Sequence, residues 1–399
     1  MPARLAATAL ALLALPAFAD PVAQGPKNVP AFEPAFPEQT RAPEMRSGVE
    51  LDVATVAKGL VHPWGVAPLP EGGWLVTERP GRMRVVAADG TVSEPLAGVP
   101  EVHAEKQGGL LDLALSPDFA TDRRVYFTYA KPMEAGLSAT AAARGRLTPD
   151  GTALEGVEDV FVQAPPSPSS LHYGSRLVFD GEGHLFVTTG EHFTPAERVF
   201  AQDLGKTYGK VIRIDPDGGT PEDNPFVGTE GAVPTIWSFG HRNIQAAALD
   251  AQGQLWIVEH GPQGGDELNR IEPGKNYGWP VISYGQNYDG SPVGDGITAA
   301  EGMEQPRYYW DPVIAPSGLI FYAGELFPDW QGDALIGALS PGGIMRLRLD
   351  GDTVVGEERL LPDRGRIRDL AIDPDGALIA ITDAENGELL RITPAAPAE

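Results

Sequence analysis

The chain has 399 residues, of which 55 are Asp or Glu and 30 are Lys or Arg, giving a formal net charge of −25. This charge repels phosphate backbones and anionic lipid surfaces, so no nucleic-acid partner is expected. The chain contains no Cys, which excludes disulfides, thiolate metal sites and cysteine nucleophiles. Its 48 Gly and 38 Pro favour many short strands joined by turns over a helical fold.

Residues 1–19 are typical of a secretory signal peptide. Arg4 precedes an apolar run from Leu5 to Leu15, and Ala17-Phe18-Ala19 forms a small-x-small cleavage site. The run is too short to cross a bilayer comfortably, and no later segment is long and apolar enough to do so. We therefore expect cleavage after Ala19, no membrane insertion, and a soluble periplasmic or secreted protein. A buried first helix or a retained anchor is the alternative.

Residues 20–47 are rich in Pro and show no sustained helix or strand period. They are expected to form a linker or a tail that lies on the surface. At the other end, residues 395–399 are expected to form a short C-terminal tail.

Between these ends, residues 48–394 contain a repeated strand-turn-strand pattern, with turns rich in Asp, Gly or Pro. Six copies begin near residues 65, 110, 175, 245, 318 and 368. Small sheets that are apolar on both faces become stable by stacking in a closed ring. The pattern predicts an all-β, six-bladed β-propeller of four-stranded antiparallel blades. Residues 49–56 are predicted to pair with residues 389–392 and close the ring. Two separate β-sandwiches are the alternative.

Several short motifs occur in a fixed order along these repeats. They are Gln107-Gly-Gly-Leu110, Leu171-His-Tyr-Gly-Ser-Arg176, His241-Arg-Asn243, Glu259-His-Gly-Pro262 and Asn276-Tyr-Gly-Trp279. Together they resemble the soluble aldose sugar dehydrogenases that use pyrroloquinoline quinone (PQQ) and calcium. The resemblance implies a quinoprotein oxidoreductase with an aldose substrate. Because the chain has no Cys to attach haem, electrons would leave to an external acceptor.

His172 matches the proton acceptor of that family. The resemblance implies that His172 takes the proton of the anomeric hydroxyl while hydride passes to the quinone, which leaves a lactone; imidazole titrates in the right range. The family motif is His-x-Gly-Gly-Arg-Leu, whereas Ser175 replaces the second Gly and Leu171 replaces a polar residue before the His. A different residue would then have to orient the imidazole. The alternative is a structural histidine.

Other positions match the cofactor-binding residues of the family. Arg242 and Asn243 correspond to a pair that stabilises charge on the quinone oxygen. Arg366 and Arg368 alternate along a predicted strand, so they face the same side, although a solvated strand face is the alternative. Two further matches are Gln107 and Thr382. Where the family often has a Lys near the cofactor, this chain has Ser340.

Calcium is satisfied by carboxylate, carbonyl and phenolic oxygens. The resemblance implies that the backbone carbonyls of Gly261 and Pro262 contact the ion associated with the cofactor. It also implies that Glu267 and Tyr277 are ligands of another calcium. The alternative is an irregular turn with solvent-facing carboxylates.

Two other functions remain open for a propeller with these residues. A calcium-dependent lactonase-type hydrolase would use carboxylates and a metal-bound water. A non-catalytic carbohydrate-binding propeller would use His172 and the arginines to bind sugar hydroxyls. The combination of Gln107, His172, Arg242, Asn243, Arg366 and Arg368 favours the dehydrogenase.

Overall fold

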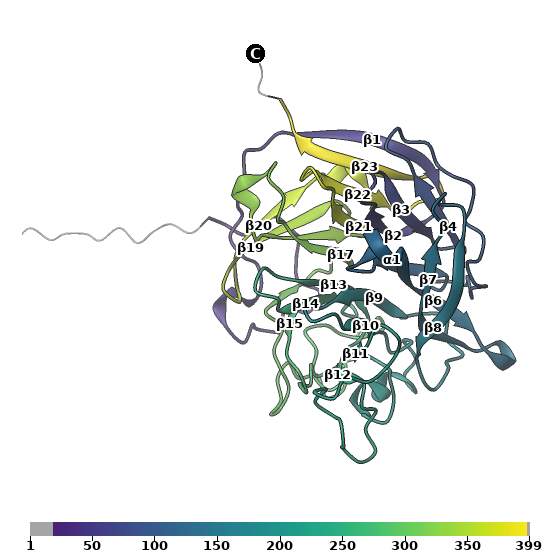
Figure 1. The fold of residues 1–399 in the computed structure, drawn as a ribbon. Helices are drawn as coiled ribbons and strands as arrows, with labels where there is room; N and C mark the ends of the chain where they lie inside the picture. The colour runs from purple at the N-terminus through teal and green to yellow at the C-terminus, as the bar shows by residue number, and fades with distance from the viewer. Residues whose placement is uncertain (1–18, 397–399) are drawn as a thin grey trace, which may run out of the picture.

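The computed structural model describes residues 19–396, which form six antiparallel sheets around a central axis (Figure 1). One strand of each sheet lies nearest the axis. Each of these inner strands contacts the next, and the last contacts the first, so the ring is closed. The inner strands are β2 (Pro63–Pro68), β5 (Leu110–Leu115), β9 (Gly174–Phe179), β13 (Ile244–Leu249), β17 (Pro316–Phe321) and β21 (Ile367–Ile372). The predicted six-bladed propeller is confirmed.

Each blade adds strands outward from its inner strand. The first three blades add β3 (Trp74–Glu78) and β4 (Arg82–Val86); β6 (Arg124–Pro132), β7 (Ser138–Leu147) and β8 (Leu154–Val162); and β10 (Leu185–Thr189), β11 (Lys210–Ile214) and β12 (Ile236–Phe239). The fourth and fifth add β14 (Leu255–Glu259), β15 (Asp266–Ile271) and β16 (Tyr308–Trp310); and β18 (Ala334–Ala338), β19 (Ile344–Asp350) and β20 (Thr353–Leu360). The sixth adds β22 (Leu378–Thr382), β23 (Gly387–Pro394) and β1 (Leu51–Leu60).

Five blades therefore have four strands, whereas the first has three. In place of a fourth, outermost strand, the first blade has a single antiparallel bridge between Val86 and Val92. In the part of the chain that the structure describes, helical structure is confined to short turns, which are α1 (Phe119–Asp122), η1 (Pro37–Gln39), η2 (Glu134–Gly136), η3 (Arg198–Gln202), η4 (Pro328–Trp330) and η5 (Pro362–Arg364). None of the helices within residues 19–396 has the length and hydropathy needed to cross a membrane.

The ring is closed by pairing the two ends of the propeller. Strand β1 pairs antiparallel with β23, and Val53 lies opposite Ile392 and Thr55 opposite Leu390. Figure 1 shows the purple N-terminal strand beside the yellow C-terminal strand. The predicted pairing is confirmed, although the strand begins at Leu51. The sixth blade thus contains strands from both ends of the chain, which makes ring closure a long-range event in folding.

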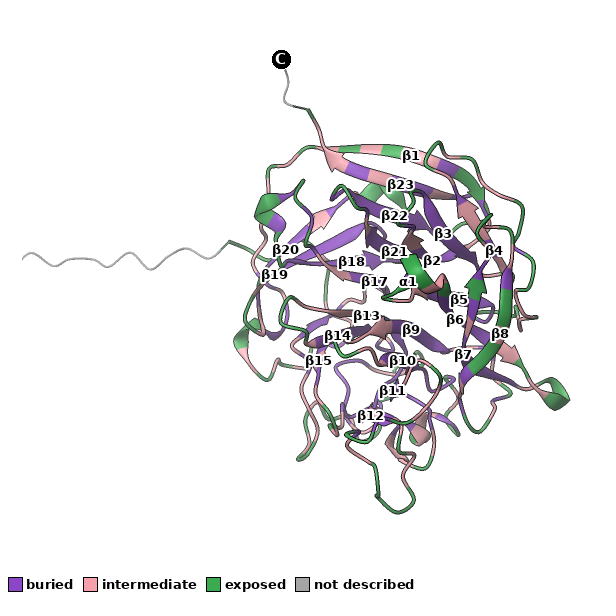
Figure 2. Cartoon of the chain, viewed as in Figure 1, coloured by how far each residue is buried: buried purple, intermediate pink, exposed green. Residues whose placement is uncertain are grey.

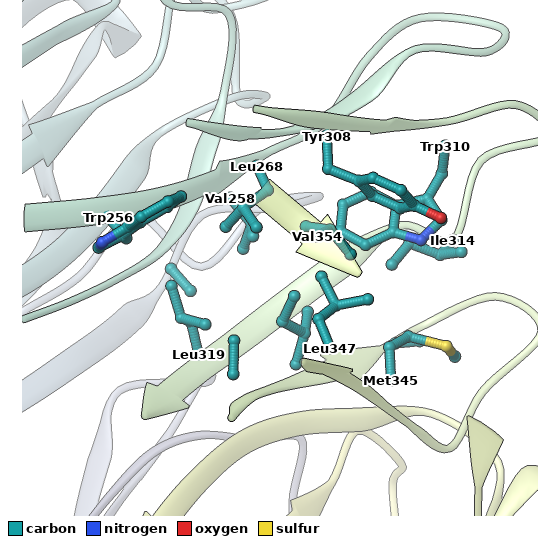
Figure 3. Close-up of a cluster of buried hydrophobic side chains, with 14 of the residues drawn as sticks. Trp256, Val258, Leu268, Tyr308, Trp310, Ile314, Leu319, Met345, Leu347 and Val354 are labelled. Carbon is teal, nitrogen blue, oxygen red and sulfur yellow. The ribbon is translucent and has the colours of Figure 1, made fainter. Parts of the chain in front are cut away.

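The hydrophobic core lies between neighbouring blades. Figure 2 shows buried residues along the inner strands and exposed residues on outer strands such as β1 and β8. Figure 3 shows the largest cluster, in which Trp256 and Leu268 of blade four face Leu319 and Leu347 of blade five. Full burial of such a side chain contributes about 1.5–3 kcal/mol. The stacking of blades therefore supplies the stabilisation that each small sheet lacks alone.

Residues 20–47, here called the N-terminal strap, lie against the edge of blade four. The backbone N–H groups of Asn28 and Val29 donate to the carboxylate of Asp311, at 2.6 and 2.9 Å. The hydroxyl of Thr40 donates to the carbonyl of Tyr309 at 2.8 Å. These contacts cover the outermost strand of the blade. The predicted signal peptide lies outside the described residues apart from Ala19.

Candidate active site

A cavity of about 580 Å³ opens at the ends where the inner strands begin. This volume is in the usual range for ligand pockets, roughly 300–1,000 Å³. Its lining is rich in cationic and amide side chains. The polar and aromatic residues that line it are His62, Trp64, Arg79, Lys106, Gln107, Tyr173, Asn243, Gln245, His260, Arg366, Arg368 and Asp383. A basic cavity in a protein of net charge −25 suits an anionic ligand.

A buried ion cluster joins the inner strands beside Trp64, one of the residues that line this cavity. The guanidinium of Arg176, on β9, lies 2.8 Å from carboxylate oxygens of both Asp112 on β5 and Asp369 on β21. The same group lies over the ring of Trp64 at 4.4 Å and donates to the carbonyl of Gln245. Arg176 thereby ties β9 to β5, β13 and β21 by polar contacts and to β2 through the ring of Trp64.

His172 lies two residues before β9 and is not among the residues that line the cavity, but the next residue in the chain, Tyr173, lines it. Its backbone N–H donates to Oε1 of the cavity residue Gln107 at 2.8 Å, and its φ of 48° is in the left-handed region. Its Nδ1 lies 3.2 Å from Oε1 of Glu191, and the side chains are 6% and 1% exposed. Burial, followed by the positive charge of Arg242, holds the pKa of His172 below its ordinary value. The imidazole is therefore neutral at neutral pH.

Glu191 is the residue that orients His172, and it was not identified from the sequence. It follows Gly190 at the end of β10, where a Cβ on the glycine would lie 1.9 Å from the carbonyl oxygen of His172. Glycine therefore allows the two segments to approach. The pKa of Glu191 is lowered by His172 and Arg242 even though burial opposes this. The signal in the sequence was a Gly-Glu pair directly after a strand.

Arg242 lies between Glu191 and the loop that follows β14. Its Nη1 donates to the carbonyls of His260 and Gly261, at 3.0 and 2.8 Å. Its Nε is buried, has no hydrogen-bond partner, and lies 4.0 Å from Oε1 of Glu191. One carboxylate therefore faces both His172 and Arg242. The unpaired Nε is a donor that a ligand oxygen can satisfy.

Asn243 joins two parts of the cavity wall. Its Oδ1 accepts hydrogen bonds from the N–H of Gly174 and from Nε2 of Gln245, both at 3.2 Å. The structure thus brings Gln107, His172, Arg242 and Asn243 into one connected region.

Arg366 and Arg368 both line the cavity, as the alternation along β21 predicts. They share Oδ2 of Asp383, at 2.7 Å from Nη2 of Arg366 and 3.1 Å from Nη2 of Arg368. The side chain of Arg366 is 49% exposed, whereas that of Arg368 is buried, with an unpaired Nε. Burial lowers the pKa of Arg368 to about 10, so it remains a cation. A solvated strand face is therefore excluded for Arg368.

Thr382 is not among the residues that line the cavity. It lies at the end of β22, and its hydroxyl accepts a hydrogen bond from the N–H of Glu388 at 2.8 Å. Conversely, Arg79 and Lys106 line the cavity although no motif identified them. These two cations come from the loops of the first two blades. They supply positive charge in the cavity, whereas the family Lys is replaced by Ser340 in this chain.

A second, much smaller space of about 10 Å³ lies behind Arg242. It is lined by Glu259, Gly261, Pro262, Glu267 and Tyr277, among others. This volume suits one water-sized species, for which roughly 10–15 Å³ is needed. All four predicted calcium-binding residues therefore meet around one small space.

Two carboxylates line this space: Glu259 is buried, and Glu267 is half-buried. Nδ2 of Asn269 donates to Glu259 at 3.1 Å and to Glu267 at 3.0 Å. Burial and the negative charge of Glu259 raise the pKa of Glu267 to about 8. The alternative of solvent-facing carboxylates does not hold for Asp266, which is 1% exposed, whereas Glu267 is partly exposed. A divalent cation would relieve the repulsion.

Tyr277 cannot offer its phenolic oxygen to an ion without losing existing bonds. Its hydroxyl donates to the carbonyl of Arg270 at 2.7 Å and accepts from the N–H of Glu272 at 2.9 Å. Its ring stacks on His241 at 4.7 Å. The main-chain carbonyl of Tyr277 is the oxygen left to act as a ligand.

A further acidic group, formed by Asp180, Glu182 and His184, is held by a cation already. Nε of Arg213 lies 3.2 Å from Asp180, and Nη2 lies 3.3 Å from Glu182. The N–H groups of Glu182 and His184 also donate to Asp180. The group is the hairpin turn between β9 and β10, not a calcium loop.

The fold and the cavity define a six-bladed propeller with a cavity lined by cationic side chains, and comparison with known proteins identifies its family. The profile of the glucose/sorbosone dehydrogenase family matches residues 60–391. The aldose sugar dehydrogenase YliI of Escherichia coli K12 is 44% identical over 349 residues, which cover 86% of this chain and 93% of that protein. The chain therefore belongs to the glucose/sorbosone dehydrogenase family.

Solved structures agree. A crystal structure of a glucose dehydrogenase has a TM-score of 0.83 and 47% identity, covering 86% of this chain and 100% of that one. The PQQ-bound aldose sugar dehydrogenase of Streptomyces coelicolor has a TM-score of 0.70 and 30% identity, covering 86% of this chain and 99% of that one. The expected family and the expectation of an oxidoreductase are confirmed.

Proposed function

We propose that this protein oxidises aldose sugars at the anomeric carbon to the lactone, using PQQ and calcium, with His172 as the base. The observation that carries the proposal is the buried contact between His172 and Glu191, which lies next to a cavity lined by cations. A hydrolase or a simple binding site has no need for paired arginines facing an anion.

His172 is suited to accept a proton at Nε2. Because Glu191 accepts a hydrogen bond at Nδ1, the proton of the neutral ring resides on Nδ1 and the lone pair is on Nε2. Removal of the proton from the anomeric hydroxyl makes the attached carbon a better hydride donor. The negative charge of Glu191 then stabilises the imidazolium that forms.

The cavity fits a tricarboxylate such as PQQ. Arg242 and Arg368 each have a buried Nε without a partner, and Arg366 lies at the exposed edge. Gln107 and Asn243 add amide groups, and Arg79 and Lys106 add positive charge that compensates for Ser340. When bound, PQQ supplies the ortho-quinone that accepts the hydride. Arg242 and Asn243 orient and stabilise negative charge beside it. Thr382 contributes indirectly, through the start of β23.

Calcium is proposed to be held by oxygen atoms around the small space behind Arg242. Carbonyls of Gly261 and Pro262 serve the ion next to the cofactor, and Glu267 with the carbonyl of Tyr277 serves a structural ion. The donor set, all hard oxygen atoms, suits calcium. We also propose export of the protein after cleavage at Ala19, and an external acceptor that removes the electrons.

The test is reconstitution with PQQ and calcium, followed by dye reduction with several aldoses. The wild type should turn over, and His172→Ala should retain the absorbance of bound PQQ while losing roughly 10²–10⁴-fold in kcat. His184→Gln, outside the cavity, is the matched control and should remain active. Lactone hydrolysis without PQQ would establish the hydrolase instead, and sugar binding without any quinone reduction would establish the binding propeller.

A further inference from the structure

An exposed aromatic side chain, Phe193, lies beside the proposed base, and a second, Tyr288, lies beside Phe193. Within residues 19–396, Phe193 and Tyr288 are the aromatic side chains that reach exposures above one third, at 39% and 65%. They are far apart in the chain, yet their ring centroids are 6.2 Å apart. Paired aromatic rings left open to water mark a surface that is covered by a ligand.

Phe193 also contacts the base itself. Its ring centroid lies 5.1 Å from that of His172, with the ring planes at 79°. The carboxylate that orients the base holds Phe193 as well, because Oε2 of Glu191 accepts the N–H of Phe193 while Oε1 faces Nδ1 of His172. The position of the aromatic ring is thereby tied to the position of the base.

The loops that carry the two rings are fixed to each other. Nη1 of Arg198 donates to Oδ1 of Asn287 at 2.9 Å, which links the loop after β10 to the turn that carries Tyr288. That turn is closed by the N–H of Asn287 donating to the carbonyl of Ser291. Phe193 has a φ of 72°, a conformation that is unfavourable for a bulky residue and that persists where the surroundings enforce it.

We propose that Phe193 and Tyr288 form a stacking wall that determines which sugars are preferred. Phe193 contacts the apolar C–H face of the pyranose ring whose anomeric hydroxyl is at His172. Tyr288, farther from the base and more exposed, contacts the next pyranose ring of a reducing disaccharide. Pyranose rings present C–H groups on their faces, which the negative face of an aromatic ring attracts. This inference rests on the proposed function, since it places the sugar at His172.

The test uses substitutions that keep apolar volume but remove the ring. Tyr288→Leu should lower kcat/KM for maltose roughly tenfold and leave that for glucose within about twofold. Tyr288→Trp should retain the preference for maltose. Phe193→Leu should lower kcat/KM for both sugars. Val355→Ala, 42% exposed on β20 and remote from the site, is the control and should change neither.

A binding measurement tests the contact between the sugar and the two aromatic rings independently of sugar oxidation. Saturation-transfer NMR of maltose with the wild-type protein should show contact of both sugar rings, and Tyr288→Leu should lose the signal of the non-reducing ring alone. If Tyr288→Leu lowered kcat/KM equally for glucose and maltose, or did not lower it for maltose, the proposed stacking wall would be wrong. If the wild type oxidises no aldose but binds maltose through Tyr288, the proposed function fails and the wall stands.

Discussion

Oε1 of Glu191 lies 3.2 Å from Nδ1 of His172, and the two side chains are almost completely buried. The pairing gives the imidazole a fixed tautomer and a fixed direction. A buried carboxylate beside a histidine also stabilises the charge that the ring acquires when it accepts a proton.

Glu191→Gln should lower kcat by about 10²-fold, because the amide keeps the shape but not the charge. It should also move the acid limb of the pH profile. The base works only when unprotonated, so activity is lost as pH falls through the pKa of His172. Glu191 raises that pKa, against burial and Arg242; its loss should therefore shift the acid limb of kcat/KM to lower pH. An unmoved limb would contradict the role assigned to Glu191.

Arg368→Ala should weaken PQQ binding more than activity at saturation. A charged hydrogen bond contributes about 1.5–3 kcal/mol, equivalent to roughly 10–100-fold in Kd. Titration of PQQ followed by its absorbance measures the change. Arg391→Ala is the matched control, since Arg391 pairs with Asp373 in the same blade but outside the cavity. Equal effects of the two substitutions would show that Arg368 acts through the blade and not through the cofactor.

Calcium should raise the melting temperature of the wild type, and chelation should lower it. A ligand at a hundredfold excess over its Kd stabilises by about 2.7 kcal/mol. Glu267→Gln removes the half-buried carboxylate whose pKa is raised by burial and by the charge of Glu259, so the metal-free variant should melt no lower than the wild type. The calcium-dependent increment should disappear. Calorimetry with and without chelator measures the rise in melting temperature that calcium causes. A rise in the variant as large as in the wild type would exclude Glu267 as a ligand.

Arg176→Leu should destabilise the fold by about 3–5 kcal/mol, because it leaves Asp112 and Asp369 buried without their cation. Denaturant unfolding measures the loss. The control is Arg146→Leu, whose pair with Glu155 is solvent-exposed and should contribute no more than about 1 kcal/mol. A small effect at Arg176 would mean that water or repacking compensates at the axis.

Much of the fold was predictable because propeller strands are local and repetitive. The six pattern starts coincide with the six inner strands, and residues 51–60 pair with the C-terminal strand as expected. The three-stranded first blade was not predictable, since residues after Val86 form only a bridge. Their sequence has no apolar alternation to distinguish a bridge from a short strand.

The sequence alone determined the type of fold and the family, because strand periodicity and short motifs depend on neighbouring positions in the chain. Only the tertiary structure decided which side chains meet. Glu191 at His172, Arg79 and Lys106 in the cavity, and Tyr288 beside Phe193 come from segments far apart in the chain. The physical reason is that closing the ring brings the ends of six inner strands to one cavity, and that geometry has no local signature.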